Sequence, residues 1–253
     1  MNESSDAARN SQADLYLVGA GILFPEHLTV QTIEILENCQ RICTNVPETR
    51  LAALPKEIRE KCVCLWPLYK DNRKRIDNYR DVIDAVVDIV REHRPSAWMT
   101  PGHPFVFDSV SQKLLGKARE FGWTAQIVPG ISSLDTLLAQ IPYDPCYGLV
   151  VHEATALVRD KIPLISSLAT VLFQPSIFGS DLTHHSRQYA GPSLRDLSAH
   201  LLQFYPPQHK CALVYSALSE NDDARTVWEA LGKLDSISFD SLRGSTLFIP
   251  PVR

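Results

Sequence analysis

The chain alternates short apolar runs with segments of helical period, and this alternation constrains its fold more than any other feature. Runs of four or five apolar residues match strands, and the segments between them carry apolar residues every three or four positions, as a helix with one buried face does. Such alternation is typical of a mostly parallel sheet covered by helices, and so of an α/β fold. In the first half, strands are predicted at Leu15–Val18, 41–44, 62–65, 97–100 and 124–128.

The intervening helices are also marked by their apolar spacing. The clearest runs from about Asp71 to Glu92, where Ile76, Tyr79, Ile83, Val86 and Val90 fall on one face. Other helices are predicted from about Thr29, from Asp108 to Phe121 and just after residue 133. The second half is less regular, with strands predicted at 149–151, 170–173, 211–215 and 245–249, helices near 194–204 and 224–231, and a polar surface loop at 180–192.

The length of 253 residues suits two domains, each large enough to bury its own core. Five strand–helix units are complete near residue 128, and the turn at 129–133 is the candidate boundary. We therefore expect a disordered polar tail at 1–13, an N-terminal α/β domain at 14–128 and a C-terminal α/β domain at 129–253. The tail has neither the basic start nor the apolar core of a signal peptide, which favours a cytoplasmic protein.

Charge and cysteine usage limit the classes of partner. With 25 Lys and Arg against 29 Asp and Glu, the net charge of −4 lacks the basic footprint of most nucleic-acid-binding proteins. No apolar stretch approaches the roughly 20 residues of a membrane-spanning helix. The six cysteines form no CxxC pair, so buried thiols are expected rather than a disulfide framework or a metal site.

Three short motifs imitate known sites without completing them. Gly19-Ala20-Gly21 follows the first predicted strand but lacks a third glycine, and the second strand ends in Thr44-Asn45 without an acidic residue, so an ordinary Rossmann site is not supported. The glycines are interpreted as a tight strand-to-helix turn. The run His152 to Ala156 lacks the second histidine of a zinc-protease helix, and the adjacent His184 and His185 suit a surface loop better than a metal pair.

A cluster of basic and aromatic residues stands at the start of the longest predicted helix. Arg75 and Tyr79 are four apart and share a helix face, while Trp66 and Tyr69 precede them at the carboxyl end of a strand, where α/β sheets place ligands. An arginine and a tyrosine at a cleft edge can hold and polarise a carbonyl group. The same residues also suit a solvated helix start, and spacing alone leaves both interpretations open.

Taken together and in order, several segments resemble the tetrapyrrole methylase superfamily of S-adenosylmethionine-dependent methyltransferases. These segments are 15–36, 100–107, 125–141, 172–174 and 245–251. Within the superfamily, residues 68–83, the Gly102-His103-Pro104 turn, residues 143–155 and the closing Ile-Pro-Pro are most similar to the borosin peptide backbone N-methyltransferases.

The resemblance implies two α/β domains with S-adenosylmethionine in the cleft between them, usually within a homodimer. Motif position then implies seven cofactor-binding residues: Pro101, Gly102, His103 and Val106 of the first domain, and Ser132, Gln174 and Thr246 of the second. In this superfamily the cofactor is held differently from an ordinary Rossmann site, which accounts for the missing acidic residue after the second strand.

On the acceptor side, borosin enzymes carry four residues at a fixed spacing. A first tyrosine is followed three residues later by a second tyrosine, six residues after that by an arginine, and four residues after the arginine by a third tyrosine. The same spacing here reads Trp66, Tyr69, Arg75 and Tyr79, so the resemblance implies catalytic roles for Tyr69, Arg75 and Tyr79. Trp66 departs from the pattern, because an indole can donate one hydrogen bond but cannot accept a proton as a phenolate can. Pro101 and Phe105 depart from the tyrosine and glycine that usually flank the Gly-His-Pro turn.

Three functions are therefore considered. The first is N-methylation of backbone amides in a precursor peptide, which would be a separate molecule because the chain stops at Arg253. Arg75 would stabilise the imidate oxygen while Tyr69 or Tyr79 orders the amide or helps remove its proton. The second is C- or N-methylation of a tetrapyrrole or another small natural product. The third is a non-catalytic, cofactor-binding partner subunit, suggested by the altered positions Trp66 and Pro101.

Overall fold

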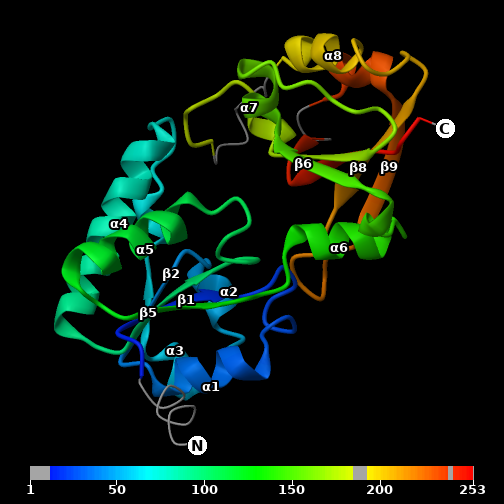
Figure 1. Ribbon diagram of the computed structural model, residues 1–253. Helices are drawn as coiled ribbons and strands as arrows, with labels where there is room; N and C mark the ends of the chain where they lie inside the picture. The colour runs from blue at the N-terminus through cyan, green and yellow to red at the C-terminus, as the bar shows by residue number, and fades with distance from the viewer. Residues whose placement is uncertain (1–11, 185–192, 239–241, 253) are drawn as a thin grey trace, which may run out of the picture. The chain divides into compact units, whose positions relative to one another are not determined.

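The computed structural model describes residues 12–184, 193–238 and 242–252, and the chain forms two compact units, residues 1–132 and 133–253. Figure 1 traces the chain from the first unit, in blue to green, to the second, in green to red. Most of the predicted polar tail and the second part of the predicted loop at 180–192 lie outside the described residues.

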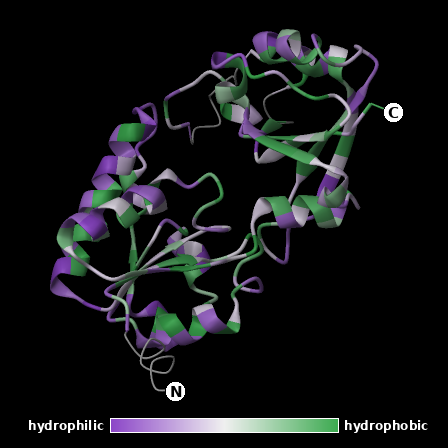
Figure 2. Ribbon diagram, viewed as in Figure 1, coloured by the Kyte–Doolittle hydropathy of each residue, from purple (hydrophilic) through white to green (hydrophobic). Residues whose placement is uncertain are grey.

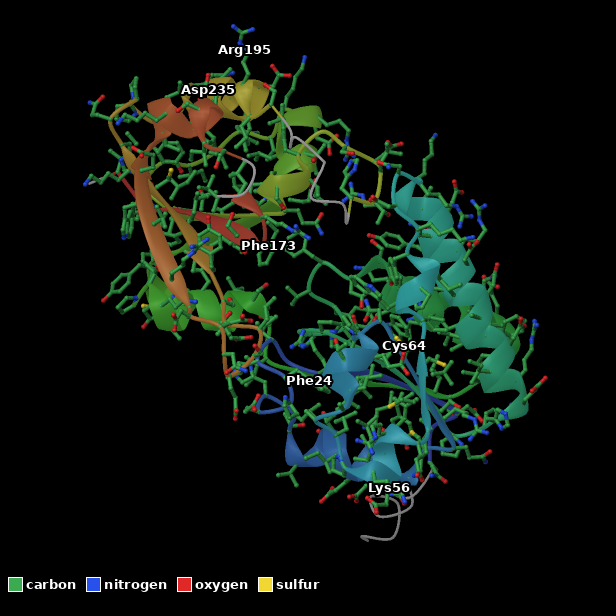
Figure 3. The ribbon with its side chains drawn as sticks, turned by 180° about the vertical axis from the view of Figure 1, so that it is seen from behind. Phe24, Lys56, Cys64, Phe173, Arg195 and Asp235 are labelled. Carbon is green, nitrogen blue, oxygen red and sulfur yellow. The ribbon has the colours of Figure 1, made fainter. Side chains whose placement is uncertain are left out.

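The first unit is built on a five-stranded parallel sheet with the strand order β3-β2-β4-β1-β5. Its strands are β1 (Leu15–Gly19), β2 (Arg41–Thr44), β3 (Cys62–Cys64), β4 (Ser96–Thr100) and β5 (Ala125–Val128). All five strand predictions for this half are confirmed to within one residue at each end. Cys64, labelled in Figure 3, marks the carboxyl end of the outermost strand β3.

Helices cover both faces of this sheet, because successive side chains of each strand point to opposite sides. Leu15 and Leu17 of β1 share one core with α4 (Arg75–Glu92) and α5 (Ser109–Phe121), whereas Tyr16 and Val18 share another with α1 (Val30–Asn38) and α3 (Lys56–Arg59). Figure 1 shows the sheet between these two helical layers, and Figure 2 shows the green apolar strands between helices with purple outer sides. The remaining helices of the unit are α2 (Glu48–Leu51) and the short 3-10 helix η2 (Trp66–Leu68).

The ends of the longer helices follow their capping residues. Asp108 accepts hydrogen bonds from the amides of Val110 (2.8 Å) and Ser111 (3.1 Å) and so begins α5, while Gly122 ends it in a left-handed conformation. Helix α4 starts at Arg75 rather than at the predicted Asp71, because Asn72 adopts a positive φ of 55° that interrupts a helix. Among the described residues, no helix combines the length and the apolar character needed to cross a membrane.

The second unit carries a mixed sheet with the strand order β6-β7-β10-β8-β9. Its strands are β6 (Leu149–Glu153), β7 (Ala169–Phe173), β8 (Lys210–Tyr215), β9 (Arg225–Ala230) and β10 (Ser245–Ile249). β6 and β7 are parallel, and the pairs β7–β10, β10–β8 and β8–β9 are antiparallel. The expectation of a mostly parallel sheet thus holds for the first unit and not for the second.

Helices α7 (Ala154–Arg159) and α8 (Arg195–Leu201) and the 3-10 helix η5 (Leu231–Ser236) pack on this sheet around one core. The unit also contains α6 (Ser133–Gln140), whose buried Leu137 lies outside that core, and the 3-10 helices η3 (Pro145–Tyr147) and η4 (Pro175–Ile177). The helix predicted near 224–231 is wrong, because this segment is strand β9. Thr226, Val227 and Trp228 favour a pleated strand, and β9 pairs with β8 along all six of its residues.

All six cysteines are free thiols, and their burial departs from the prediction at one position. Cys39, Cys43 and Cys211 are buried and Cys62 and Cys64 are half-buried, whereas Cys146 is exposed. Cys146 lies in the short helix η3 between α6 and β6, outside either core, so the prediction of buried thiols is wrong for it.

Candidate functional site

The carboxyl edge of the first sheet gathers the predicted glycine and proline turns. Strands β1, β4 and β5 end level with one another, since Gly19 pairs with Thr100 and Val18 pairs with Val128. Each strand is followed at once by one of the sequence motifs: Gly19-Ala20-Gly21, Pro101-Gly102-His103 and Pro129-Gly130. In open α/β sheets this edge is where ligands bind.

Three glycines bring the backbones of these loops together. A Cβ built on Gly19 would lie 2.5 Å from the carbonyl oxygen of Gly102 and 2.6 Å from the amide nitrogen of Gly130, and one on Gly130 would meet the same carbonyl at 2.5 Å. Gly21 and Gly102 also exchange two backbone hydrogen bonds, of 3.2 and 2.8 Å. The glycines after β1 therefore let neighbouring loops approach closely, and they do not make the tight strand-to-helix turn that the sequence predicts, because α1 begins only at Val30.

The residues predicted to bind cofactor in the first unit lie at this edge, in the β4–α5 loop and just before α6. Gly102 is buried with a φ of +75°, and Pro101 beside it is exposed. The half-buried His103 accepts the amide proton of Phe105 on Nδ1 (3.0 Å), and its carbonyl accepts from the amide of Val106 (3.1 Å). Ser132 is buried directly before α6, with 4% of its surface exposed.

Of the three cofactor-binding residues predicted in the second domain, Ser132 belongs to the first unit, and the other two lie at one end of adjacent strands of the second. Leu247 of β10 pairs with Leu172 of β7 in antiparallel register, so Thr246 lies level with Phe173, and Gln174 follows directly. Phe173 is labelled in Figure 3. Thr246 is buried, and Gln174 adopts a left-handed backbone conformation with a φ of 61°. A non-glycine residue held in this conformation often marks a functional position.

The predicted acceptor-side residues form an aromatic row in the first unit. The rings of Trp66 and Tyr69 lie 5.9 Å apart, and those of Tyr69 and Tyr79 meet edge to face at 6.2 Å. Arg75 is the first residue of α4, one turn before Tyr79. The structure thus brings Trp66, Tyr69 and Tyr79 together, and Arg75 is close enough to Tyr79 for its charge to act on the hydroxyl.

Burial sets the protonation of both tyrosines. Burial raises the pKa of Tyr69 above its ordinary value, and the nearby carboxylate of Asp108 raises it further, while a side-chain hydrogen bond from Asn45 lowers it. Burial also raises the pKa of Tyr79, against the opposing charge of Arg75. At neutral pH both hydroxyls are protonated and can donate hydrogen bonds.

Asp108 and Asn45 belong to this site although motif spacing did not single them out. Asp108 is held by the hydroxyl of Ser111 (2.9 Å), which in turn accepts the indole N–H of the fully buried Trp98 (3.1 Å). Asn45 follows β2 at the same sheet edge. One feature of the sequence points to Asn45: it comes directly after a predicted strand, at the position where an ordinary Rossmann site carries an acidic residue.

The incomplete metal motifs have structural roles. Glu153 begins α7 by accepting from the amides of Thr155 (3.0 Å) and Ala156 (2.7 Å). His184 contacts the hydroxyl of Ser180 at 2.9 Å, and His185 lies outside the described residues. Across residues 12–184, 193–238 and 242–252, no three His, Cys, Asp or Glu side chains gather as a metal site would require.

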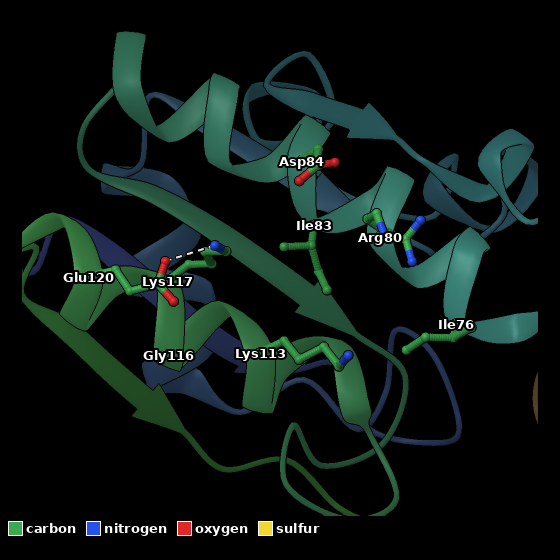
Figure 4. Close-up of a pocket in the computed structure, with 8 residues that line it drawn as sticks. All are labelled: Ile76, Arg80, Ile83, Asp84, Lys113, Gly116, Lys117 and Glu120. Atoms are coloured by element: carbon green, nitrogen blue, oxygen red, sulfur yellow. Dashed lines mark hydrogen bonds and ion pairs between the residues drawn. The ribbon is translucent and has the colours of Figure 1, made fainter.

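A surface groove of about 570 Å³ lies between α4 and α5, on the helical layer rather than at the sheet edge (Figure 4). Ile83 points into it, and Lys117 pairs with Glu120 at 2.7 Å. The groove is lined by Ile76, Arg80, Ile83, Asp84, Lys113, Gly116, Lys117 and Glu120. It contains none of the predicted catalytic residues Tyr69, Arg75 and Tyr79, and we assign the candidate site to the sheet edge.

Curated proteins similar to this chain are named both as methyltransferases and as precursors of ribosomally synthesized cyclic peptides. The "methyltransferase/ribosomally synthesized type I borosin cyclic peptide precursor" of Coprinopsis marcescibilis is 32% identical over 176 residues, which are 69% of this chain and 45% of the relative. The "methyltransferase/ribosomally synthesized cyclic peptide dendrothelin A precursor" of Dendrothele bispora is 27% identical over 97% of this chain and 59% of its own length. The chain thus spans about half the length of these relatives.

Solved structures of the same architecture are more distant in sequence. Uroporphyrin-III C-methyltransferase from Thermus thermophilus, complexed with S-adenosyl homocysteine, matches with a TM-score of 0.62 at 17% identity over 93% of this chain and 96% of that one. Cobalt precorrin-4 methyltransferase matches with a TM-score of 0.60 at 13% identity over 93% and 94%. These matches confirm the predicted α/β fold.

The family comparison covers most of the chain. The model for Tetrapyrrole (Corrin/Porphyrin) Methylases matches residues 14–234, which include the turns at the first sheet edge, the aromatic row and Gln174. The resemblance found in the motifs is therefore confirmed, and the chain belongs to the family of tetrapyrrole (corrin/porphyrin) methylases.

Proposed function

We propose that this chain is an S-adenosylmethionine-dependent methyltransferase that methylates backbone amide nitrogens of a peptide supplied as a separate molecule. The observation that carries the proposal is the contact of Tyr69 with Tyr79 next to Arg75, at the spacing of the borosin enzymes. Membership of the methylase family supports the reaction, and relatives named as cyclic peptide precursors, one of them a borosin precursor, support a peptide acceptor.

The residues at the two sheet edges fit an adenosyl cofactor. In the first unit, glycines let the backbones at the ends of β1, β4 and β5 pack against one another at the carboxyl edge of the sheet, which is where α/β sheets bind ligands. In the second, Gln174 is held in a left-handed conformation, one residue beyond the position of β7 that lies level with Thr246. The residues that would hold the cofactor are Pro101, Gly102, His103, Val106, Ser132, Gln174 and Thr246. When bound, S-adenosylmethionine supplies a methyl group activated by a sulfonium.

The acceptor-side residues suit the demands of an amide. Its nitrogen is a poor nucleophile, because its lone pair is delocalised into the carbonyl and its proton leaves only far above neutral pH, so negative charge must be stabilised on the oxygen as the nitrogen reacts. Arg75 supplies a fixed positive charge there. Tyr69 and Tyr79, whose raised pKa keeps them protonated, supply hydrogen-bond donors to the same oxygen. As the bond from nitrogen to the methyl group forms and the bond from that group to sulfur breaks, the amide proton passes to solvent water.

The test is incubation with isotopically labelled S-adenosylmethionine and a panel of short unstructured peptides, followed by fragment mass analysis. The expected product carries one labelled methyl group on a backbone nitrogen. A parallel panel of tetrapyrroles tests the second function, and label found there or on a peptide side chain would refute the proposal. Retention of S-adenosyl homocysteine without product on either panel would favour the non-catalytic subunit.

We propose further that the protein works as a homodimer in the cytoplasm. Family resemblance supports the dimer. Sedimentation equilibrium of the purified chain at micromolar concentration tests it, with twice the mass of one chain expected and the mass of a single chain contradicting it.

A further inference from the structure

Asn45 occupies a fixed position at the carboxyl edge of the first sheet. It follows β2 directly, and hydrogen bonds hold the backbone of both of its neighbours. The carbonyl of Thr44 accepts from the amide of Leu65 (2.8 Å), and the hydroxyl of Thr44 accepts from the amide of Val46 (3.0 Å). Its backbone is therefore held in place.

The side-chain oxygen of Asn45 is buried without a hydrogen-bond partner among the described residues. Asn45 lowers the pKa of the Tyr69 hydroxyl, as a hydrogen-bond donor beside it does, so the amide N–H of Asn45 rather than Oδ1 faces Tyr69. Buried acceptors are almost always paired, because an unpaired one forfeits its hydrogen bonds to water. An unpaired acceptor beside the aromatic row is accounted for by a ligand that brings an N–H to it.

A peptide has the matching polarity. Each peptide unit presents one carbonyl acceptor and one N–H donor. Arg75, Tyr69 and Tyr79 can supply donors for the carbonyl, and Asn45 Oδ1 supplies an acceptor for the N–H. The four residues converge because Asn45 contacts Tyr69, Tyr69 contacts Tyr79, and the charge of Arg75 reaches Tyr79.

We propose that Asn45 Oδ1 accepts a hydrogen bond from the backbone N–H of an acceptor residue next to the one that is methylated, which makes Asn45 a positioning residue for peptide substrates. This inference rests on the proposed function and adds a requirement to it: the acceptor must offer a free N–H beside the reacting amide. An acceptor already methylated at that neighbouring nitrogen would be a poor substrate.

The first experiment compares Asn45→Leu, Asn45→Asp and wild type, using the peptide that wild type methylates best in the panel. Asn45→Leu removes the acceptor and is expected to raise KM about tenfold with a smaller change in kcat, as loss of one hydrogen bond predicts. Asn45→Asp keeps an acceptor oxygen and is expected to stay within about threefold of the wild-type KM. The matched control is Asn38→Leu, because Asn38 is exposed at the end of α1, where it donates to the carbonyl of Glu34.

Two further measurements separate positioning from a structural or cofactor role. Asn45→Leu removes the unpaired buried acceptor and also the N–H directed at Tyr69, two losses with opposite effects on stability, so it is expected to unfold close to the wild-type temperature. Its affinity for S-adenosyl homocysteine is expected to stay within twofold. A lower unfolding temperature, weaker binding of S-adenosyl homocysteine or an unchanged KM would each overturn the assignment of Asn45 as a positioning residue for the acceptor peptide.

The second experiment replaces single backbone amides of that peptide with esters, which removes one N–H at a time. At the position that contacts Asn45, the ester is expected to cost wild type about tenfold in kcat/KM and to cost Asn45→Leu nothing. If every ester costs both proteins equally, the inference is wrong although peptide methylation stands. If wild type methylates no peptide at all, the proposed function itself fails and the inference falls with it.

Discussion

Replacing Gly19 with alanine is expected to destabilise the first unit by about 3 kcal/mol. An added Cβ would lie 2.5 Å from the Gly102 carbonyl oxygen, 2.6 Å from the Gly130 nitrogen and 2.7 Å from the Gly130 Cα, whereas ordinary contacts lie at 3.4–4 Å. Overpacking a well-packed site costs about 1–3 kcal/mol. The upper end applies here because all three contacts are to backbone, so two loops must move and no side chain can rotate away.

Gly116→Ala is the matched control, because it adds the same methyl group where there is room. A Cβ on Gly116 would meet no heavy atom within 4 Å in the described part of the chain. Gly116 lies inside α5, so alanine is expected to stabilise the unit by about 0.5–1 kcal/mol through its higher helix propensity. The same chemical change thus has opposite signs at the two positions.

The assay is urea unfolding followed by tryptophan fluorescence. Trp98 is fully buried in the core of the first unit and reports on its loss. Gly19→Ala should lower the midpoint of this transition and Gly116→Ala should raise it. An unchanged midpoint for Gly19→Ala would show that the three loops at the sheet edge separate easily, and the close backbone packing would then have no energetic consequence.

Three more predictions concern the side chains of the two units. Arg75→Ala is expected to lower peptide turnover by about 10²–10³-fold, measured by radiolabel transfer, while S-adenosyl homocysteine still binds, measured by calorimetry. Turnover at the wild-type rate would show that Arg75 has no part in the mechanism. Burial raises the pKa of Cys39, Cys43 and Cys211 to about 12. A thiol reagent at neutral pH should therefore label the exposed Cys146 in the native protein and the other three only after denaturation. Labelling of Cys211 in the native protein would contradict this expectation. Burial also raises the pKa of Tyr69 and Tyr79, so their titration is expected to leave the free energy of unfolding unchanged below about pH 10, where the phenols of the unfolded chain begin to ionise. Above that pH the free energy of unfolding is expected to fall, because only the unfolded chain loses these protons. Tyr69→Phe should weaken this fall in urea titrations, and an equally steep fall would contradict the assignment.

Local pattern was a good guide where a segment is buried on both faces. The bounds Arg41–Thr44 and Ser245–Ile249 are as predicted, since short apolar runs bounded by polar residues leave little choice of strand ends. The pattern was misleading at Arg225–Ala230, which is an edge strand with one neighbour and mixed exposure. There the apolar spacing fits either structure, and tertiary pairing with β8 decides it.

The candidate site could be predicted to the extent that its residues are close in sequence. Tyr79 follows Arg75 by one helical turn, and Tyr69 precedes α4 by a short loop, so their proximity follows from local geometry. From distant segments, Asn45 acts on Tyr69 and Asp108 acts on both tyrosines. Which atom of Asn45 lacks a partner depends on how three separate loops pack, and no local spacing contains that information.

The central position of β1 also has a consequence for how the chain is made. β1 is synthesised before the other strands of its sheet, yet it lies between β4 and β5, so its buried residues Leu15–Gly19 must await Ser96–Thr100 on one side and Ala125–Val128 on the other. At about 5–20 residues per second, that interval is on the order of ten seconds. During this time a fully apolar strand emerges from the ribosome without either lateral neighbour, and it is the segment of the first unit with the greatest need of chaperone protection.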